Sequence, residues 1–427
     1  MNIDSLIGSY FRRSNRRYMS FTESPAGTRL PSPNPASQYT LYLHIPYCVV
    51  LCPFCSFHRV KFKRDPAKKY FQALRREIKR VTDAGYRFGE LYVGGGTPTV
   101  LPGELIRTID LVRELHPVQG TSAETNPSDL TDDMLRDLRG AGVSRLSVGV
   151  QSFDDELLQE MQRLEKYGSG DQIRDRLQHA QGVFDTLNVD MIFNFPHQTE
   201  ASLNRDLHIL VDELKVDQVS FYPLMSANST RKSMLRTVGS VDYARERHLY
   251  QIIAGQMLAN GYTRSSAWCF SRQPGMFDEY IVANEEYVGL GSGAFSYLQG
   301  SLFASTFSIN HYLRLVNAGN TGTVRRRDMT QRDQIRYYLL MRLFGGSLNR
   351  AAAEARFDGS FQRTLWPEIA ALSAMGAIWE SDGELRLTEN GYYLWVMMMR
   401  EFFIGVNNLR AEMRHYIARE NAIMLAR

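Results

Sequence analysis

Short apolar segments alternate with amphipathic helical segments through the first half of this chain of 427 residues. Between two of the apolar segments, Tyr70, Leu74, Ile78 and Val81 recur at helical spacing. Such repeated strand–helix units predict an α/β fold of parallel strands with right-handed crossovers, in which chemistry gathers at the carboxyl ends of the strands. The predicted strands are 41–45, 90–93, 120–124, 145–150, 187–193 and 218–222.

A compact cysteine group follows directly after the first predicted strand. Cys48, Cys52 and Cys55 are separated by three and then two residues, and Cys269 is the only other cysteine. Three thiolates on one loop can hold three irons of a [4Fe–4S] cluster and leave the fourth iron open. An open iron can bind a substrate or co-substrate, whereas a cluster with four thiolates mainly passes electrons.

Two other interpretations of the triplet compete with the iron–sulfur cluster. A zinc site usually pairs CxxC units or adds histidines, and His44 and His58 flank this loop, so a Cys3His zinc site stays open. A disulfide fits poorly, because an odd number of cysteines on one loop leaves a thiol unpaired and the rest of the chain nearly lacks cysteine.

Five motifs follow one another between about residues 40 and 300. They are Tyr-Leu-His-Ile-Pro-Tyr-Cys at 42–48, Gly-Gly-Gly-Thr-Pro-Thr at 94–99, Ser-Val-Gly-Val-Gln-Ser-Phe at 147–153, Asp190 with Pro-His-Gln-Thr at 196–199, and Gly-Leu-Gly-Ser-Gly-Ala at 289–294. In this order they resemble the radical S-adenosylmethionine (SAM) superfamily, in the branch typified by oxygen-independent coproporphyrinogen III oxidase. The resemblance implies a partial (β/α)6 barrel that is open on one side, which suits a large substrate.

The resemblance also implies the cofactors and the residues that hold them. Cys48, Cys52 and Cys55 would ligate the cluster as catalytic residues. One electron from this cluster would cleave SAM to a 5′-deoxyadenosyl radical that abstracts hydrogen. A second SAM is a possibility, since the family's later glycine segment borders a second site. An electron donor such as flavodoxin or ferredoxin is expected. The residues expected to contact SAM are Tyr42, Gly95, Gly96, Thr97, Glu124, Gln151, Arg163, Asp190 and Gly291.

Each of the SAM positions also has a purely structural interpretation. A glycine run alone usually marks a turn, and the segment around Gly291 is as typical of a structural turn as of a ligand site. Arg163 fits a surface helix as well as a partner for the SAM carboxylate. Glu124, Gln151 and Asp190 fit polar strand ends. Cys269, in an aromatic setting, is expected to be a buried structural thiol, or else a partner for a substrate radical.

The chain divides into four predicted parts. Residues 1–39 form an arm with Arg12, Arg13, Arg16 and Arg17, expected to be solvated or to cover the active site, and 40–225 form the barrel. Residues 226–325 form an extension with a helix over 241–260, irregular structure and the glycine segment. Residues 326–427 form a winged-helix-like module, with helices over 331–344 and 361–375 and a hairpin over 377–387 that turns at Asp382-Gly383.

The module ends in an apolar stretch over 392–413 with three consecutive methionines. It is predicted to be a helix packed on the winged module, or else a wall for a hydrophobic substrate or a subunit contact. The net charge of +4 is slight for this length, so the module is expected to pack on the barrel and no nucleic-acid partner is expected.

Composition places the chain among ordinary globular proteins. Its 44% apolar and 22% charged residues are typical of soluble domains, and no apolar run reaches the roughly 18 residues that span a bilayer. The N-terminus lacks the features of a secretion signal, and free thiols suit a reducing compartment. A cytoplasmic protein without a transmembrane segment is predicted.

The expected activity is that of a radical SAM oxidoreductase acting on a large substrate, with a tetrapyrrole favoured. Oxidative decarboxylation, methyl transfer from a second SAM and haem ring opening all fit the motifs, and a haem-binding carrier on the same scaffold is the alternative outside enzymes. The coproporphyrinogen oxidases of the family carry a fourth cysteine two residues after the triplet, where Phe57 stands here. This departure weakens the case for coproporphyrinogen III itself. Basic residues after the loop, expected to bind propionates or to face solvent, are Arg59, Lys61, Lys63 and Arg64.

Overall fold

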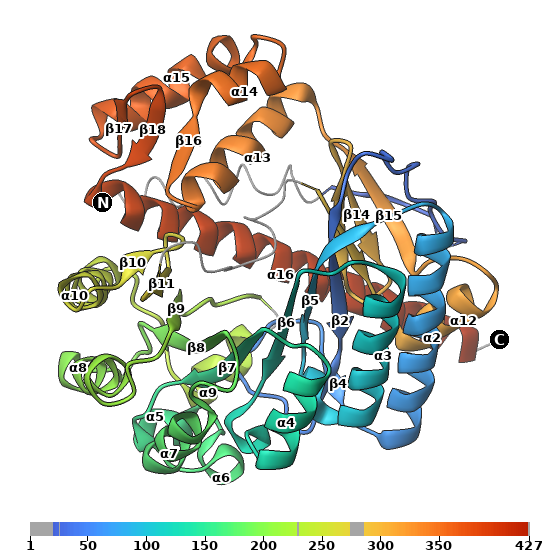
Figure 1. The fold of residues 1–427 in the computed structure, drawn as a ribbon, viewed down its shortest axis with the longest axis horizontal. Helices are drawn as coiled ribbons and strands as arrows, with labels where there is room; N and C mark the ends of the chain where they lie inside the picture. Colours follow the sequence, from blue (N-terminus) through green and yellow to red (C-terminus); the bar gives the residue numbers. More distant parts are fainter. Residues whose placement is uncertain (1–19, 25, 229, 274–285, 426–427) are drawn as a thin grey trace.

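A computed structural model describes residues 20–24, 26–228, 230–273 and 286–425, with side chains described as far as Arg414. The predicted arginines of the N-terminal arm, Arg12, Arg13, Arg16 and Arg17, lie outside the described residues. Six neighbouring parallel strands form the barrel, so the predicted α/β class with a parallel-strand sheet is confirmed (Figure 1). In spatial order these strands are β2 (Tyr39–Ile45), β5 (Phe88–Gly95), β6 (Gly120–Thr125), β7 (Arg145–Gln151), β8 (Thr186–Phe193) and β9 (Gln218–Pro223).

Helices connect the barrel strands and pack against the sheet through their apolar faces. In α2, for example, Tyr70, Leu74, Ile78 and Val81 are buried as their spacing predicts. The helices are α2 (Arg64–Asp83), α3 (Pro102–Leu115), α4 (Asp132–Gly140), α5 (Asp155–Glu160), α6 (Leu164–Tyr167), α7 (Gly170–Ala180), α8 (Glu200–His208), α9 (Arg231–Thr237), α10 (Glu246–Ala259) and α12 (Ile309–Asn317). Shorter turns are η1 (Pro98–Val100), η2 (Pro127–Asp129) and the π-helical η3 (Ile209–Glu213).

The barrel strands belong to a larger sheet, which has thirteen strands among the described residues. Next to β2 lie β12 (Tyr287–Leu290), β13 (Phe295–Leu298), β14 (Ser301–Ser305), β15 (Thr323–Asp328) and β1 (Thr22–Glu23), and beyond β9 lie β11 (Cys269–Ser271) and β10 (Thr263–Arg264). Of these, β12 pairs parallel with β2 and extends the barrel. The prediction of irregular structure after residue 260 was therefore wrong, because these strands are too short to show a period. The sheet crosses the predicted boundaries at 39/40 and 225/226, and the division into four parts stays a prediction.

The C-terminal module has a small sheet of its own, in the order β16-β18-β17. The two predicted helices and the hairpin are present as α13 (Gln331–Phe344), α15 (Phe361–Ala374), β17 (Ile378–Ser381) and β18 (Glu384–Leu387). Two elements that the sequence did not predict complete it, β16 (Ser347–Asn349) and α14 (Arg350–Arg356).

A long helix, α16 (Glu389–Leu425), links the module to the barrel. Figure 1 shows it in red, running across the width of the sheet. Near its start the Trp395 indole donates a hydrogen bond to the carbonyl oxygen of Leu340 in the module, whereas farther along Leu409 and Met413 pack with Phe307 beside the barrel. The prediction of a helix packed on the winged module therefore describes only the first part of α16. None of the helices in the described part of the chain has the length and apolar character needed to cross a membrane.

Candidate functional site

The cysteine triplet lies on the loop between two short paired strands at the carboxyl end of β2. The strands are β3 (Tyr47–Cys48) and β4 (Val60–Lys61), which pair in parallel and hold the two ends of the loop together. Cys48 and Cys52 are buried, Cys55 is partly buried, and all three thiols are free of disulfides. The Arg59 guanidinium donates to the backbone carbonyl oxygens of Cys52 and Cys55, which fixes the curvature of the loop.

Polar donors from outside the cysteine loop reach two of the thiols. The Thr97 hydroxyl lies 3.6 Å from the sulfur of Cys48, and Nη1 of Arg163 lies 3.6 Å from the sulfur of Cys52. Burial raises the pKa of the Cys48 thiol to about 11 despite the Thr97 hydrogen bond. Iron would therefore have to displace a proton from this sulfur.

The spacing of the thiols bears on which metal group they suit. Zinc ligands all contact one ion at about 2.0–2.3 Å and must crowd together. Among the described residues, no three His, Cys, Asp or Glu side chains come that close. In a cubane cluster each iron takes its own thiolate, so more widely separated sulfurs suit it.

The glycine run after β5 lies against the cysteine loop, and side chains would not fit there. A Cβ atom at Gly96 would lie 2.7 Å from the carbonyl oxygen of Tyr47 and 3.0 Å from the sulfur of Cys48. Gly95 has a φ of +118°, and its Cβ would meet the ring of His44. The Gly95 N–H donates to the carboxylate of Glu124, and the Gly96 N–H donates to the carbonyl oxygen of Ile45. These two N–H groups are already engaged, so the groups that Gly95 and Gly96 offer to SAM are their carbonyl oxygens, which would accept hydrogen bonds from its amino group.

Two partly buried carboxylates lie on β6 and β8, the strands on either side of β7. Glu124 in β6 accepts hydrogen bonds from the Tyr92 hydroxyl at 3.1 Å and from the N–H of Gly95 at 2.9 Å. Asp190 in β8 accepts from Ser147 and Asn188, each at 2.8 Å. Burial, and next the charge of Asp190, raise the pKa of Glu124 to about 7. A carboxyl with this pKa binds neutral hydroxyl groups without needing a cation.

Tyr42 joins this polar group from β2. Its hydroxyl lies 2.9 Å from Nδ1 of His44, while Nε2 of the same ring lies 2.8 Å from the backbone carbonyl oxygen of His58. Because the carbonyl can only accept, Nε2 carries the proton and Nδ1 accepts from Tyr42. Burial lowers the pKa of His44 to about 3, so the ring is neutral. It holds the Tyr42 hydroxyl in one orientation.

Gln151 and Arg163 follow one another along the chain at the end of β7 and before α6. Gln151 ends β7 at a register shift and has a φ of +79°. Arg163 precedes α6, is only 3% exposed, stacks on the ring of Tyr167 at 4.1 Å and donates to the carbonyl oxygen of Gly149. It is therefore not on the surface. Its Nε is buried without a hydrogen-bond partner, which leaves a donor for a ligand.

Gly291 lies in the turn after β12, with a φ of +96°. Its N–H donates to the carboxylate of Glu77 at 3.0 Å, and a Cβ there would lie 2.7 Å from the carbonyl oxygen of His44. Glu77 also accepts from Gly322 and from the Tyr312 hydroxyl. This carboxylate fastens the glycine segment to α2. Glu77 was not among the predicted site residues, although a glutamate on the apolar face of a helix indicates a buried carboxylate with specific partners.

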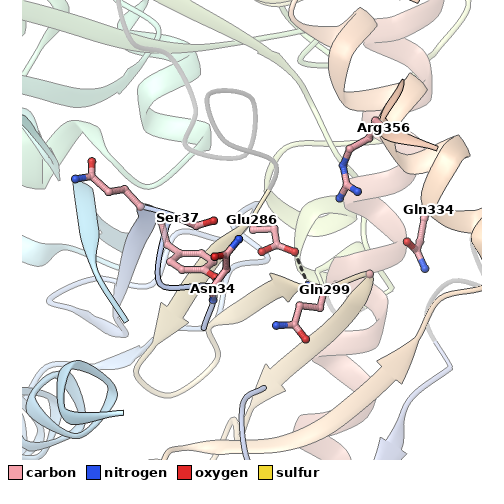
Figure 2. A pocket seen from close by; sticks show the side chains of 9 residues that line it. Asn34, Ser37, Glu286, Gln299, Gln334 and Arg356 are labelled. Carbon is pink, nitrogen blue, oxygen red and sulfur yellow. Dashed lines mark hydrogen bonds between the residues drawn. The ribbon is translucent and has the colours of Figure 1, made fainter. Parts of the chain in front are cut away.

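Other candidates lie apart from this group. Cys269 is fully buried in β11, opposite Ser220 of β9. A cavity of about 660 Å³ lies at the amino end of β2, on the opposite edge of the sheet from the cysteines (Figure 2). Amide side chains, together with Arg356 and Glu286, line it. The cysteine loop contributes nothing to its lining.

A comparison with protein-family models identifies this part of the chain. Residues 42–210 match the model described as the radical SAM superfamily, and this span holds all three loop cysteines, the glycine run, Glu124 and Asp190. The chain contains a radical SAM domain over residues 42–210. This domain implies a [4Fe–4S] cluster and SAM as the cofactors.

Relatives of known name place this radical SAM protein in the predicted branch. The heme chaperone HemW of Lactococcus lactis is 27% identical over 390 residues, covering 88% of this chain and 98% of that relative. The oxygen-independent coproporphyrinogen III oxidase of Cereibacter sphaeroides is 28% identical over 391 residues, covering 85% of this chain and 86% of the relative. The solved structure of the coproporphyrinogen III oxidase HemN of Escherichia coli matches with a TM-score of 0.73 at 23% identity, over 86% of this chain and 91% of that one. This structural match confirms the fold.

The residues of the site fit the two cofactors of radical SAM proteins. Three thiols on one loop can bind three irons of a cluster and leave the fourth iron open. The glycine run lies against this loop, where a Cβ atom would not fit. The orphaned Nε of Arg163 and the carboxylates of Glu124 and Asp190 supply groups for a charged and hydroxyl-bearing ligand.

Proposed function

We propose that this protein is a radical SAM enzyme that abstracts hydrogen from a tetrapyrrole. The observation that carries the proposal is that three thiols outside disulfides lie at the carboxyl end of β2, next to a partly buried polar group of Glu124, Asp190 and Tyr42 on the barrel strands. Chemistry in parallel α/β folds takes place at this end of the strands.

Cys48, Cys52 and Cys55 would hold the cluster. When bound, the cluster and SAM supply one-electron reduction and a 5′-deoxyadenosyl radical. Thr97 and Arg163 donate toward two of the sulfurs, and hydrogen bonds to cluster sulfurs tune the reduction potential. The Arg59 guanidinium holds the loop backbone, so the ligands are preorganised.

The remaining residues would bind and orient SAM. Glu124 would accept hydrogen bonds from ribose hydroxyls. Arg163 would pair with the carboxylate through its unpartnered Nε. Tyr42, Gln151 and Asp190 would reach other polar groups, and the glycine run would let the backbone approach the methionine end. The N–H of Gly291 is held by Glu77, so this residue would contribute shape and not a hydrogen-bond donor.

The tetrapyrrole is supported by the relatives, whose names refer to coproporphyrinogen and to heme. Oxidative decarboxylation, methyl transfer from a second SAM and ring opening would all begin with the same abstraction. An electron donor such as flavodoxin or ferredoxin and a cytoplasmic location belong to the same proposal.

A haem carrier is the second candidate. Several relatives, including those from Lactococcus lactis and Bacillus subtilis, are named heme chaperones. In addition, Phe57 occupies the position of the fourth cysteine expected for coproporphyrinogen oxidases. A carrier would bind haem stoichiometrically without consuming SAM in response to it.

The experiment that tests the proposal is anaerobic reconstitution with iron and sulfide, followed by dithionite and SAM, with and without haem or coproporphyrinogen III. Mass spectrometry follows 5′-deoxyadenosine and S-adenosylhomocysteine. We expect 5′-deoxyadenosine to rise with a tetrapyrrole, and S-adenosylhomocysteine beside it would select methyl transfer. The Cys52→Ser variant is the control and should form neither product. Tight haem binding without SAM cleavage in the wild type would favour the carrier instead.

A further inference from the structure

Exposed apolar side chains gather on the cysteine loop. Of the eight large apolar residues that are exposed in the described part of the chain, three lie on this loop: Val49 at 48%, Leu51 at 42% and Phe57 at 47%. The helix α16 reaches only Phe57 among these, because the Arg410 guanidinium lies over its ring at 5.2 Å and Arg414 donates to its carbonyl oxygen at 2.8 Å. Val49 and Leu51 lie between the first two cysteines. Exposed apolar groups that gather in this way are typical of a contact surface for a partner.

A strongly basic segment is attached to the same loop. Residues 59–69 contain six lysines and arginines and one carboxylate, a local charge of +5, whereas the whole chain carries only +4. Backbone pairing fixes this segment beside the cysteines, because Lys61 of β4 lies opposite Cys48 of β3 and the N–H of Phe62 donates to the carbonyl oxygen of Cys48 at 2.8 Å. The positive charge therefore lies next to a thiol that would bind the cluster.

The charges of this segment are open to a partner. Lys61, Lys63 and Arg64 are exposed, and within the described residues none of their side chains forms an ion pair. Asp65 is the one carboxylate of the segment, and it is exposed as well. Because the positive charges are not neutralised locally, their field extends into the solvent and steers an oppositely charged partner toward the loop.

The partner that suits this surface is an acidic one-electron carrier. Cys48 and Cys52 are 8% and 7% exposed and Cys55 is partly exposed, so the thiols lie just beneath the surface that the loop presents. Electron transfer weakens steeply with distance, so a carrier has to dock next to the cluster ligands. Interfaces of electron-transfer pairs are small, and complementary charge speeds their formation. A small apolar contact with a basic rim matches these requirements.

We propose that Val49, Leu51 and the basic residues Lys61, Lys63 and Arg64 form the docking surface for an acidic electron carrier of the flavodoxin or ferredoxin class. The inference rests on the proposed function, which requires a cluster that is reduced by one electron. In the docked pair one electron leaves the reduced flavin or iron–sulfur centre of the carrier and enters the cluster. The carrier is oxidised by one electron, the cluster is reduced by one, and no bond forms between the two proteins.

The test compares two reductants of the reconstituted cluster in the absence of a tetrapyrrole. One is a fully reduced flavodoxin of net negative charge, and the other is reduced methyl viologen, a small cation. Stopped-flow absorbance gives the second-order rate constant for each, and electron paramagnetic resonance identifies the reduced cluster. We expect flavodoxin to reduce the variant Lys61→Gln/Lys63→Gln/Arg64→Gln roughly tenfold or more slowly than the wild type at low salt, because electrostatic steering is lost.

Salt and the small cation separate docking from damage to the loop. The difference between wild type and variant should shrink at high salt, where the charges are screened. Methyl viologen should reduce the variant at least as fast as the wild type, because removing positive charge favours the approach of a cation. The apolar part is tested by Leu51→Gln, which should slow the flavodoxin reaction at low and high salt alike.

Matched controls remove the same kinds of side chain elsewhere. Leu258→Gln on α10 removes an apolar residue that is 38% exposed. The control for charge removes three exposed basic residues near the end of α2, on α15 and on β18, in the variant Lys79→Gln/Arg363→Gln/Arg386→Gln. Both controls should react with flavodoxin as the wild type does, and all variants should contain as much iron as the wild type.

Equal flavodoxin rates for the wild type and the triple variant of the basic segment would overturn the inference. In that case, a loss of haem affinity in this variant would assign the residues to propionates, and a loss of binding to anionic phospholipid vesicles would assign them to a membrane. Slower reduction by methyl viologen, or a protein that assembles no cluster, would also overturn it. The expected rates without any tetrapyrrole-dependent release of 5′-deoxyadenosine would instead refute the proposed enzyme and leave the docking surface standing.

Discussion

Glu124 is partly buried near the end of β6, between the Tyr92 hydroxyl and the backbone of Gly95. Burial raises its pKa from 4.5 to about 7. Between these two pH values the folded protein binds more protons than the unfolded chain, so this carboxyl lowers stability as pH rises through the window.

We predict that Glu124→Gln removes this loss. Between pH 4 and pH 8 the free energy of unfolding of the wild type should fall by on the order of 3 kcal/mol relative to that of the variant, because the pKa of Glu124 rises from 4.5 to about 7 on folding. Urea unfolding of both proteins at the two pH values measures the difference. The exposed Glu165→Gln serves as control, and parallel pH profiles for Glu124→Gln and the wild type would contradict the assignment.

Gly96 is the tightest contact between the glycine run and the cysteine loop. Gly96→Ala would place a Cβ 2.7 Å from the backbone oxygen of Tyr47 and 3.0 Å from the sulfur of Cys48, and a backbone atom cannot move aside easily. We expect a loss of about 1–3 kcal/mol in stability and a lower iron content after reconstitution. Gly103→Ala in α3 is the control, because its Cβ meets nothing closer than 3.6 Å. If both variants lowered the Tm and the iron content equally, crowding at the loop would not be the cause.

At the scale of elements, α16 is fastened to α10 by a buried ion network. Arg400 pairs with Glu246 of α10 and, at 2.9 Å, with Glu401 of its own helix, and all three side chains are almost fully buried. The Arg400 guanidinium also stacks on the ring of Tyr243 at 4.1 Å.

Arg400→Met should destabilise the protein by about 3–5 kcal/mol, because it leaves buried carboxylates without their cation. Adding Glu246→Gln to that variant should recover part of the loss. Denaturant unfolding measures both effects. Arg332→Met, which breaks a largely exposed pair with Glu368, is the control and should cost less than about 1 kcal/mol. An Arg400→Met protein as stable as this control would show that the network is not what fastens α16.

The sequence predicted the barrel strands well, because parallel strands covered by helices are continuous apolar runs with turn residues at their ends. It failed for β10 to β15, which are only two to six residues long, and for β16 and α14. The helix over 392–413 extends to 389–425, since no proline interrupts the pattern.

For the site, the motifs pointed to the cysteines, Glu124, Asp190 and Tyr42, because each lies on a predicted strand or follows one. The contacts of Phe57 with Arg410 and Arg414 could not be predicted from the sequence, because they depend on the path of α16 through space. The predicted roles of all these residues remain predictions for the experiments above.

At the scale of the whole molecule, one apolar core continues from the barrel into the C-terminal module. Trp268 of the barrel extension contacts Phe344 of α13 and Phe403 of α16. Since α16 packs on the module at one end and near Phe307 at the other, the parts share their stability.

We therefore predict one cooperative unfolding transition for the whole chain. Far-UV circular dichroism and tryptophan fluorescence should give coincident urea curves, and Leu409→Ala, at the barrel end of α16, should shift both curves together. A fluorescence transition at a lower urea concentration than the circular dichroism transition would show that the module unfolds separately.

The path of α16 also orders the assembly of the site in time. The cysteine loop leaves the ribosome more than three hundred residues before Arg410 and Arg414, and domains fold from the N-terminus during synthesis. A nascent barrel therefore presents its thiols to iron and sulfide before α16 has packed against the cysteine loop. We expect metal insertion to be easiest during this interval. Docking of α16 then completes the site, so a helix that is synthesised late covers a loop that is synthesised early.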